Sequence, residues 1–353
     1  GTVKGMQEAH ARYGTRSWTS LLQPAIRLAR DGFVVHPELA SYVRDEMVRL
    51  EEGTNFEDYY AGAAMGGEVF RQPELAQTLE TLASNPDAFY KGEIADLLVQ
   101  QMVRSGGLIS HQDLLDYTAV WREPLQFQWR DYQVIAAPPP SSGGVALAQL
   151  LGIHEFAATL FEGVTHNSAQ YLHLLAEIEK RVFADRGKFL GDPDFHDNPV
   201  QELMDPEYLK RRATEINPIR MSAPETVEPG LESPETTHFS IVDGDGNAVS
   251  ITYTLNWDFG SGVVVEGAGF LLNDEMDDFS AKPGVANKFG VIGDKMNAIA
   301  PGKRMLSSMT PTVLLRDGEV AMVIGTQGGS TIFTSVFQAL LNVVEFNMSA
   351  EEA

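Results

Sequence analysis

The chain has 353 residues, of which 43% are apolar and 21% charged, so it can bury one large core or two smaller ones and is not a disordered chain. Its 26 basic and 49 acidic side chains give a formal net charge of −23, which disfavours binding to nucleic acid or to an anionic membrane surface. Cysteine is absent, which excludes disulfide bonds, thiolate metal sites and a cysteine nucleophile. No apolar run approaches the roughly 20 residues of a membrane-spanning helix.

Helical periodicity dominates the first part of the chain. Apolar residues recur at helical spacing in four segments, and Ser110 with Asp113 resembles the capping box of a fifth, short helix. Gly32 and the pair Gly106-Gly107 are typical of helix C-termini. The predicted helices cover residues 17–29, 37–52, 74–84, 93–105 and 110–117.

The middle of the chain contains a hairpin, two helices and a connector. Residues 125–129 and 132–136 flank Arg130-Asp131 and predict a β-hairpin. The sequence Pro-Pro-Pro-Ser-Ser-Gly-Gly at 138–144 predicts a rigid turn, and helices follow at 145–153 and 168–189. Residues 216–234 hold four prolines and few large apolar side chains, which predicts an exposed connector.

After the connector the periodicity changes to that of strands. Residues 238–242 and 248–254 flank a Gly-rich turn, and residues 312–315 and 320–324 flank Asp317-Gly318, so both pairs predict hairpins. A buried helix is predicted at 330–346. Helices followed by hairpins, with helices at both ends, indicate an antiparallel sheet covered by helical layers.

Several motifs could be mistaken for ligand sites. Residues 243–247 resemble a calcium loop, but the positions that require Gly and Glu hold Ala248 and Thr254, so we expect a turn. The pairs Gly143-Gly144 and Gly328-Gly329 lack the continuation of a phosphate loop and predict tight turns, whose N–H groups can also hold an anion. One acidic cluster is either a solvated loop or, less favoured because no histidine is nearby, a metal site: Asp274, Glu275, Asp277 and Asp278.

Thr236 follows the connector directly and begins an apolar strand. Its spacing alone favours an ordinary strand start. If the chain were cut after Glu235, however, the new α-amine of Thr236, with a pKa of about 7.7–8.0, would lie beside the hydroxyl of the same residue and could accept its proton.

The segment that starts Thr236-Thr-His-Phe-Ser resembles the beginning of the small subunit of γ-glutamyltranspeptidases, also called glutathione hydrolases, which are N-terminal-nucleophile hydrolases. Further blocks resemble the family in the same order, among them Pro301-Gly-Lys-Arg and Gly325-Thr-Gln-Gly-Gly-Ser330. The blocks span the chain at residues 1–5, 29–32, 89–92, 138–144, 184–186, 190–193, 236–256, 271–279, 301–311 and 325–330.

The resemblance implies an α+β fold, a four-layer αββα sandwich built by both subunits of one precursor. Residues 1–235 would be an N-terminally truncated large-subunit portion and residues 236–353 a C-terminally truncated small-subunit portion, with self-cleavage between Glu235 and Thr236. Without any metal or cofactor, the enzyme would cleave the γ-glutamyl amide of glutathione or a related compound and pass the acyl group to water or to an amino-acid or peptide amine. A periplasmic or secreted location is also implied.

The resemblance also assigns roles to individual residues. Thr236 would be the nucleophile, Thr254 would orient its hydroxyl, and the N–H groups of Gly328 and Gly329 would bind the oxyanion. The α-ammonium and α-carboxylate of the glutamyl group would be held by Asn256, Glu275 and Asp278 and by Ser307 and Ser308, respectively.

Two departures from the family pattern affect the substrate site. The arginine that binds the α-carboxylate in the family would lie upstream of Gly1, and residues 280–304 correspond to a lid in which Phe289 replaces a frequent tyrosine. Three alternatives therefore stay open: an acylase for glutaryl or similar groups, a poly-γ-glutamate-processing enzyme, and a non-catalytic relative. Asn256, Glu275 and Asp278 argue against the glutaryl acylase, since a glutaryl group has no ammonium.

Overall fold

The computed structural model describes residues 1–50, 53–222, 236–287, 290 and 292–353. Within these residues the chain has an α+β structure with two compact units. The helical unit comprises Gly1–Trp121 and Asp258–Asp274, and the sheet unit comprises Arg122–Trp257 and Glu275–Ala353. The predicted subunit boundary after Glu235 concerns a cut in the chain, which this division does not test.

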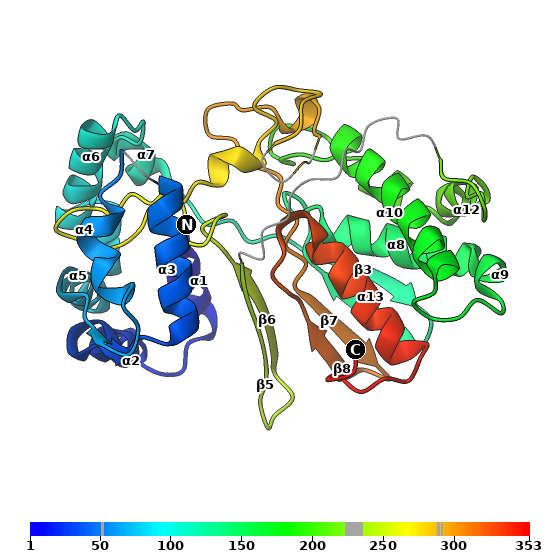
Figure 1. The fold of residues 1–353 in the computed structure, drawn as a ribbon, viewed down its shortest axis with the longest axis horizontal. Helices are drawn as coiled ribbons and strands as arrows, with labels where there is room; N and C mark the ends of the chain where they lie inside the picture. Colours follow the sequence, from blue (N-terminus) through cyan, green and yellow to red (C-terminus); the bar gives the residue numbers. More distant parts are fainter. Residues whose placement is uncertain (51–52, 223–235, 288–289, 291) are drawn as a thin grey trace. The chain divides into compact units, whose positions relative to one another are not determined.

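The helical unit contains all five helices predicted for the first part of the chain and two that were not predicted, α1 and α4 (Figure 1). Helix α1 has no buried residue, so it lacks the apolar stripe by which sequence analysis recognises a helix. A two-stranded ribbon is formed by β1 (Phe33–Val34) and β2 (Val69–Phe70). The helices are α1 (Thr2–Tyr13), α2 (Trp18–Asp31), α3 (Pro37–Leu50), α4 (Phe56–Tyr60), α5 (Pro73–Ser84), α6 (Glu93–Ser105) and α7 (His111–Asp116).

The segment Asp258–Asp274 returns to the helical unit and forms part of its core. Val265 and Ala268 are fully buried in a cluster with residues of α6. The Thr78 hydroxyl donates to the Ala268 carbonyl at 2.8 Å, and the Asn55 amide exchanges two hydrogen bonds with the backbone of Val264. These bonds give partners to buried backbone groups of Val264 and Ala268, which helps an irregular segment to lie inside this unit.

The sheet unit is built on a four-stranded antiparallel sheet with the order β3-β4-β7-β8. The strands are β3 (Leu125–Trp129), β4 (Tyr132–Ala136), β7 (Thr312–Arg316) and β8 (Glu319–Ile324), so both predicted hairpins are confirmed. The pairing of β4 with β7 puts Val134 opposite Leu314, and both side chains are fully buried. The sheet therefore joins strands from the two sides of Thr236.

Three helices form the main core with this sheet: α8 (Gly143–Phe156), α10 (Ala169–Phe189) and α13 (Ile332–Val344) (Figure 1). Helix α8 is buried on nearly all sides and begins two residues before the predicted start at 145. Gly144 is required there because a Cβ atom would lie 2.3 Å from the Ala137 carbonyl oxygen. Shorter helices complete the unit: α9 (Ala158–Phe161), α11 (Val200–Leu203) and α12 (Pro206–Thr214).

Strands β5 (Thr237–Val242) and β6 (Ala248–Tyr253) form the third predicted hairpin, which has one polar and one apolar face. On the polar face, the Ser250 hydroxyl donates to the Ile324 carbonyl at 3.2 Å and accepts from the Thr312 N–H at 3.1 Å, which links the hairpin to β7 and β8. The side chains of the apolar face are 39–55% exposed: Phe239, Ile241, Val249, Ile251 and Tyr253. Residues 223–235, which include most of the predicted connector, lie outside the described residues.

Candidate active site

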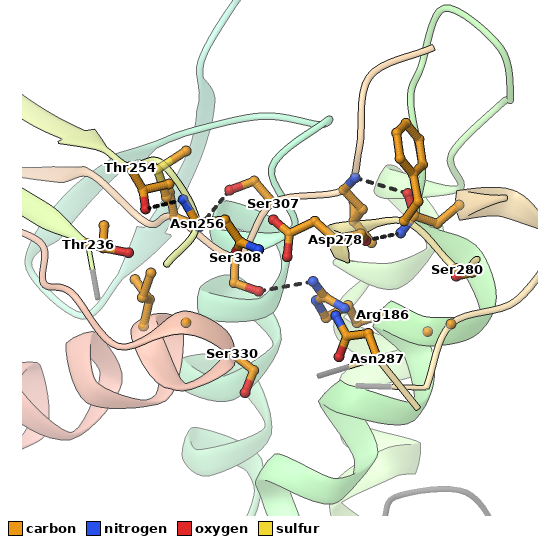
Figure 2. Close-up of a pocket in the computed structure, with 18 residues that line it drawn as sticks. Arg186, Thr236, Thr254, Asn256, Asp278, Ser280, Asn287, Ser307, Ser308 and Ser330 are labelled. Carbon is orange, nitrogen blue, oxygen red and sulfur yellow. Dashed lines mark hydrogen bonds between the residues drawn. The ribbon is translucent and has the colours of Figure 1, made fainter. Parts of the chain in front are cut away.

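A pocket in the sheet unit is lined by side chains from segments that are distant in the chain (Figure 2). Of the nine residues to which the sequence assigned catalytic or substrate-binding roles, seven line it: Thr236, Thr254, Asn256, Asp278, Ser307, Ser308 and Gly329. The other two are not among its described lining residues; Glu275 lies in the same short 3₁₀ helix as Asp278, and Gly328 precedes Gly329. Glu235, the expected cleavage partner, lies outside the described residues.

Thr236 and Thr254 flank the open end of the β5–β6 hairpin. The last pair of the hairpin is Thr237 with Tyr253, so one further step of the antiparallel register makes Thr236 and Thr254 neighbours across the two strands. The Thr254 hydroxyl oxygen accepts a hydrogen bond from the N–H of Asn256 at 2.9 Å. Asn256 is buried and has a φ of 83°, a left-handed conformation that asparagine tolerates better than most residues.

Asp278 ends the 3₁₀ helix η3 (Glu275–Asp278), which a buried asparagine connects to Leu306, the residue before Ser307. The Asn297 side chain donates from Nδ2 to the Asp278 carbonyl at 2.7 Å and accepts at Oδ1 from the Leu306 N–H at 2.9 Å. Asn297 is only 5% exposed. The acidic end of the pocket and its serine end are therefore held by one side chain.

Ser307 is held by the proline-rich turn that precedes α8. Its N–H donates to the Pro140 carbonyl at 2.9 Å, and its own carbonyl accepts from the N–H and the hydroxyl of Ser142, both at 2.8 Å. Ser142 is fully buried. The turn at 138–144, which the sequence predicted as rigid, thus fixes the backbone of the serine pair.

Gly328 and Gly329 form the turn that leads into α13 through the 3₁₀ helix η5 (Gly329–Thr331). Their φ values are 130° and 51°, a region that glycine adopts without a steric penalty. The Thr331 hydroxyl donates to the Gly328 carbonyl at 2.7 Å and stabilises the turn. Such a turn can present backbone N–H groups to a developing negative charge.

Arg186, near the end of α10, also lines the pocket, although no role was predicted for it (Figure 2). Its guanidinium donates from Nε to the Ser142 hydroxyl and from Nη2 to the Ser308 hydroxyl, both at 2.9 Å. Burial lowers the pKa of Arg186 to about 10, although attraction to Asp278 acts in the opposite direction. At neutral pH it is therefore a buried cation.

The signal for Arg186 in the sequence was its position in the block Ala184-Asp-Arg186, which resembled the family but carried no assignment. Other polar lining residues were also given no role: three lie in the expected lid at 280–304, and one begins the predicted helix at 330–346. They are Ser280, Asn287, Asn297 and Ser330.

The other motifs singled out in the sequence have structural explanations or remain unassigned. The carboxylate of Asp243 accepts from the N–H groups of Asp245 and Asn247 at 2.9 Å, so residues 243–247 form a hairpin turn as predicted. Among the residues that the structure describes, no group of three or more His, Asp or Glu side chains could hold a metal ion. None of the described helices has the length and apolarity needed to cross a bilayer. Phe289 of the expected lid lies outside the described residues.

Comparison with known proteins identifies the family of the chain. The sequence profile of the gamma-glutamyltranspeptidase family matches residues 1–353. The chain belongs to this family. Over its whole length it is 61% identical to the glutathione hydrolase proenzyme of Pseudomonas aeruginosa, of which it spans 63%.

Two solved structures are also similar to the chain. The gamma-glutamyltranspeptidase from Pseudomonas nitroreducens complexed with L-DON is 54% identical, with a TM-score of 0.62 over 64% of this chain and 67% of that one. The cephalosporin acylase from Bacillus halodurans is 28% identical, with a TM-score of 0.82 over 99% of this chain and 64% of that one. The family predicted from the sequence is thus confirmed, and the α+β class with it.

Proposed function

We propose that this chain carries the active site of a self-processing γ-glutamyl hydrolase or transferase that acts on glutathione and related γ-glutamyl compounds. The observation that carries the proposal is the pocket itself. Thr236, a hydroxyl that could become N-terminal, shares it with one carboxylate, Asp278, and with the hydroxyl pair Ser307 and Ser308. A γ-glutamyl group needs all three features, since it presents an electrophilic amide carbon, an ammonium and a carboxylate.

The nucleophile is activated by cleavage of the peptide bond between Glu235 and Thr236. Before cleavage the Thr236 nitrogen is an amide and cannot accept a proton. Afterwards it is an amine with a pKa of about 7.7–8.0, close enough to the hydroxyl of the same residue to act as its base. Thr254, the neighbour of Thr236 in the extended register, then helps to orient the hydroxyl.

Acyl transfer proceeds through two tetrahedral intermediates. The Thr236 oxygen forms a bond to the γ-carbonyl carbon while its proton moves to the α-amine, and the carbonyl oxygen becomes an oxyanion. The N–H groups of Gly328 and Gly329 stabilise this charge, each such donor typically contributing about 2.7–4 kcal/mol. The C–N bond then breaks, the leaving amine takes the proton, and a γ-glutamyl ester of Thr236 remains. Water or an acceptor amine attacks this ester in the same way and regenerates the hydroxyl.

Specificity for the γ-glutamyl group follows from its zwitterion. Asp278, assisted by Asn256 and Glu275, compensates the α-ammonium, and Ser307 and Ser308 donate hydrogen bonds to the α-carboxylate. Both charges must be compensated because an unpaired charge in a buried site is costly.

The proposal includes the four-layer αββα sandwich. Three features of the sheet unit support it. Helices α8 and α13 cover the face of the four-stranded sheet that carries Val134 and Leu314. The β5–β6 hairpin contributes to a second sheet and is linked to β7 and β8 through Ser250. The other face of this hairpin is apolar and exposed, as expected of a sheet that a further layer covers.

The partners in the proposal are the two subunits of one precursor. Strands β3 and β4 and helices α8 and α10 would belong to the large subunit, and β7, β8 and α13 to the small subunit. The pairing of β4 with β7 and the shared core around Leu314 support a complex that remains associated after cleavage.

The experiment that tests the proposal is substitution of the nucleophile in the protein expressed from its complete gene. Wild-type protein should run as two chains on a denaturing gel, and the N-terminal sequence of the smaller one should begin Thr-Thr-His-Phe. Thr236→Ala should remain one chain and release no amine from a γ-glutamyl anilide. Thr237→Ala, the adjacent and exposed residue, is the matched control and should be processed normally. A wild-type protein that is active while uncut would contradict the mechanism.

The similarity to a cephalosporin acylase over 99% of the chain favours one second candidate, an acylase with the same threonine chemistry. The two candidates differ in the donor they require. An enzyme that uses Asp278 for an ammonium should cleave a γ-glutamyl anilide faster than a glutaryl anilide, and an acylase for glutaryl groups should show the opposite preference.

The proposed location is the periplasm or the exterior of the cell, and it rests on the family resemblance. Cell fractionation followed by an assay of γ-glutamyl anilide cleavage tests it.

A further inference from the structure

The Arg186 guanidinium joins three parts of the sheet unit behind the serine pair. It extends from α10 and donates to the hydroxyl of Ser308 (Figure 2). It also donates to the hydroxyl of Ser142, immediately before α8. Arg186 is 5% exposed and Ser142 is not exposed at all. Removing a charge from water is unfavourable unless hydrogen bonds and an opposite charge compensate it, so a buried cation of this kind indicates a specific role.

The two hydrogen bonds determine the direction in which each serine hydroxyl points. A guanidinium can only donate, so both serine oxygens must accept from it. The Ser142 hydrogen is then directed to the Ser307 carbonyl, to which Ser142 donates at 2.8 Å. The Ser308 hydrogen is likewise directed away from Arg186. Ser308 is thereby prepared to donate a hydrogen bond, which is what a bound carboxylate requires.

Like these hydrogen bonds, the positive charge of Arg186 favours the binding of a carboxylate at the serine end of the pocket. Asp278, which lines the same pocket, attracts the guanidinium, and its carboxylate alone would repel a ligand carboxylate bound nearby. A fixed cation beside Ser308 offsets that repulsion at the serine end of the pocket. The two ends of the pocket therefore differ in electrostatic character although they are close together.

We propose that Arg186 is the positioning residue of the carboxylate subsite, acting through Ser142, Ser307 and Ser308 to make this end of the pocket selective for a carboxylate-bearing acyl donor. The inference rests on the proposed function, which it deepens by naming the residue that separates the carboxylate end from the ammonium end.

Three anilides that differ only in the acyl group test the inference on the processed protein expressed from its complete gene. The γ-glutamyl donor has both charged groups, the glutaryl donor only the carboxylate, and the 4-aminobutyryl donor only the ammonium. Where turnover is slow, the same compounds are measured as inhibitors of γ-glutamyl anilide cleavage.

Arg186→Gln should raise KM or Ki for the two carboxylate-bearing compounds by about tenfold or more, as expected for loss of a charge-assisted hydrogen-bond network. It should change KM or Ki for the 4-aminobutyryl compound by less than about twofold. For the carboxylate-bearing donors it should change kcat less than it changes KM.

Three further variants separate positioning from folding. Ser142→Ala keeps Arg186 but removes one of its acceptors and one donor to the Ser307 carbonyl, and it should give the same selective rise to a smaller extent. Arg186→Lys keeps the charge but not the two-pronged geometry and should recover part of the loss. Arg181→Gln is the matched control: Arg181 is also a buried arginine of α10, but it donates to Glu177 and to backbone carbonyls away from the pocket. It should lower stability without changing the ranking of the three donors.

The outcomes distinguish this inference from the proposed function. Suppose that the wild type is active and that Arg186→Gln changes KM or Ki for all three donors by the same factor, or for none of them. The role of Arg186 is then wrong, and the proposed function still stands. A processed wild type that cleaves no γ-glutamyl anilide overturns both. A selective loss in Arg181→Gln would also overturn the inference, since it would show that any damage to α10 produces the effect.

Discussion

Asn297 links the two ends of the pocket. The residue is 5% exposed, and its amide bonds the Asp278 carbonyl and the Leu306 N–H at the same time, so it ties the acidic loop to the serine segment. A zwitterion has a fixed distance between its charges, and a site that binds both must keep a matching distance. A residue that touches neither charge can therefore control affinity.

We predict that Asn297→Ala raises KM for a γ-glutamyl donor more than it lowers kcat, and lowers the free energy of unfolding by about 1–3 kcal/mol, because two buried backbone groups lose their partners. Steady-state kinetics and chemical denaturation measure the two effects. Asn297→Asp is the companion variant: it keeps an acceptor for Leu306, but it loses the donor to Asp278 and adds a carboxylate charge. A KM unchanged in both variants would show that the spacing is set elsewhere.

Some residues of the pocket could be predicted from the sequence, and others could not. Thr236 stood out on chemical grounds because a hydroxyl residue follows a connector, and the serine pair and Asp278 followed from family blocks. Arg186 lies in a family block that carried no assigned role, and Asn297 lies outside the blocks. In the sequence Arg186 is one more cation of a helical pattern, and only the close approach of α10 to Ser142 and Ser308 gives it a partner. Their roles depend on contacts between segments that are distant in the chain, which local periodicity does not contain.

At the scale of elements, hairpins were predicted best because the signal is local. Arg130-Asp131, residues 243–247 and Asp317-Gly318 each occupy a turn between alternating strands, and the structure has the hairpins there. Helix α12 was missed although Asp205 caps it and Pro206 begins it, a combination that is readable in the sequence. Helix α8 was predicted too short because it is buried all round and shows no amphipathic period.

Helix α10 also binds Ser222, the last described residue in the first part of the predicted connector. The Glu177 carboxylate accepts from the Ser222 N–H at 3.0 Å and pairs with Lys180 and Arg181 on its own helix. Burial by itself would raise the pKa of Glu177, but the hydrogen bonds from Ser222, Lys180 and Arg181 outweigh it and hold the pKa at about 2, below the usual 4.5. This segment of chain is thus fixed by an ionised carboxylate.

The sign of the resulting pH dependence follows from linkage. Because the pKa of Glu177 is lower in the folded state, its contribution to stability is fully present above about pH 4.5 and is lost as the pH falls toward 2. We predict that wild type exceeds Glu177→Gln in free energy of unfolding at pH 7 and that this difference shrinks between pH 5 and 3. Denaturant titrations at several pH values measure it. Glu68→Gln, at an exposed position, should change the free energy by less than about 0.5 kcal/mol throughout. A difference independent of pH would contradict the assignment.

At the scale of the whole molecule, the central feature is that strands and helices from both sides of Thr236 share one sheet and one core. Sequence analysis predicted the β3–β4 and β7–β8 hairpins but gave no indication that β4 pairs with β7. Pairing between distant strands is decided by which apolar faces meet, here the faces of Val134 and Leu314, and many alternatives have the same local pattern. That pairing connects the parts of the chain on the two sides of the proposed cut.

Leu314 is the residue through which this shared core is best tested. It is fully buried on β7, opposite Val134 of β4, and packs in the cluster that contains α8 and α13.

We predict that the two chains of processed wild type co-elute in size-exclusion chromatography and separate only in denaturant. Leu314→Ala should lower the free energy of unfolding by about 2–5 kcal/mol and make the chains dissociate at lower denaturant, because the cavity lies where the two chains meet. Leu172→Ala on α10, a leucine that is 51% exposed, is the matched control and should cost less than about 0.5 kcal/mol. Chains that separate without denaturant in the wild type, or equal effects of the two substitutions, would show that the interface between the chains is not built on this sheet.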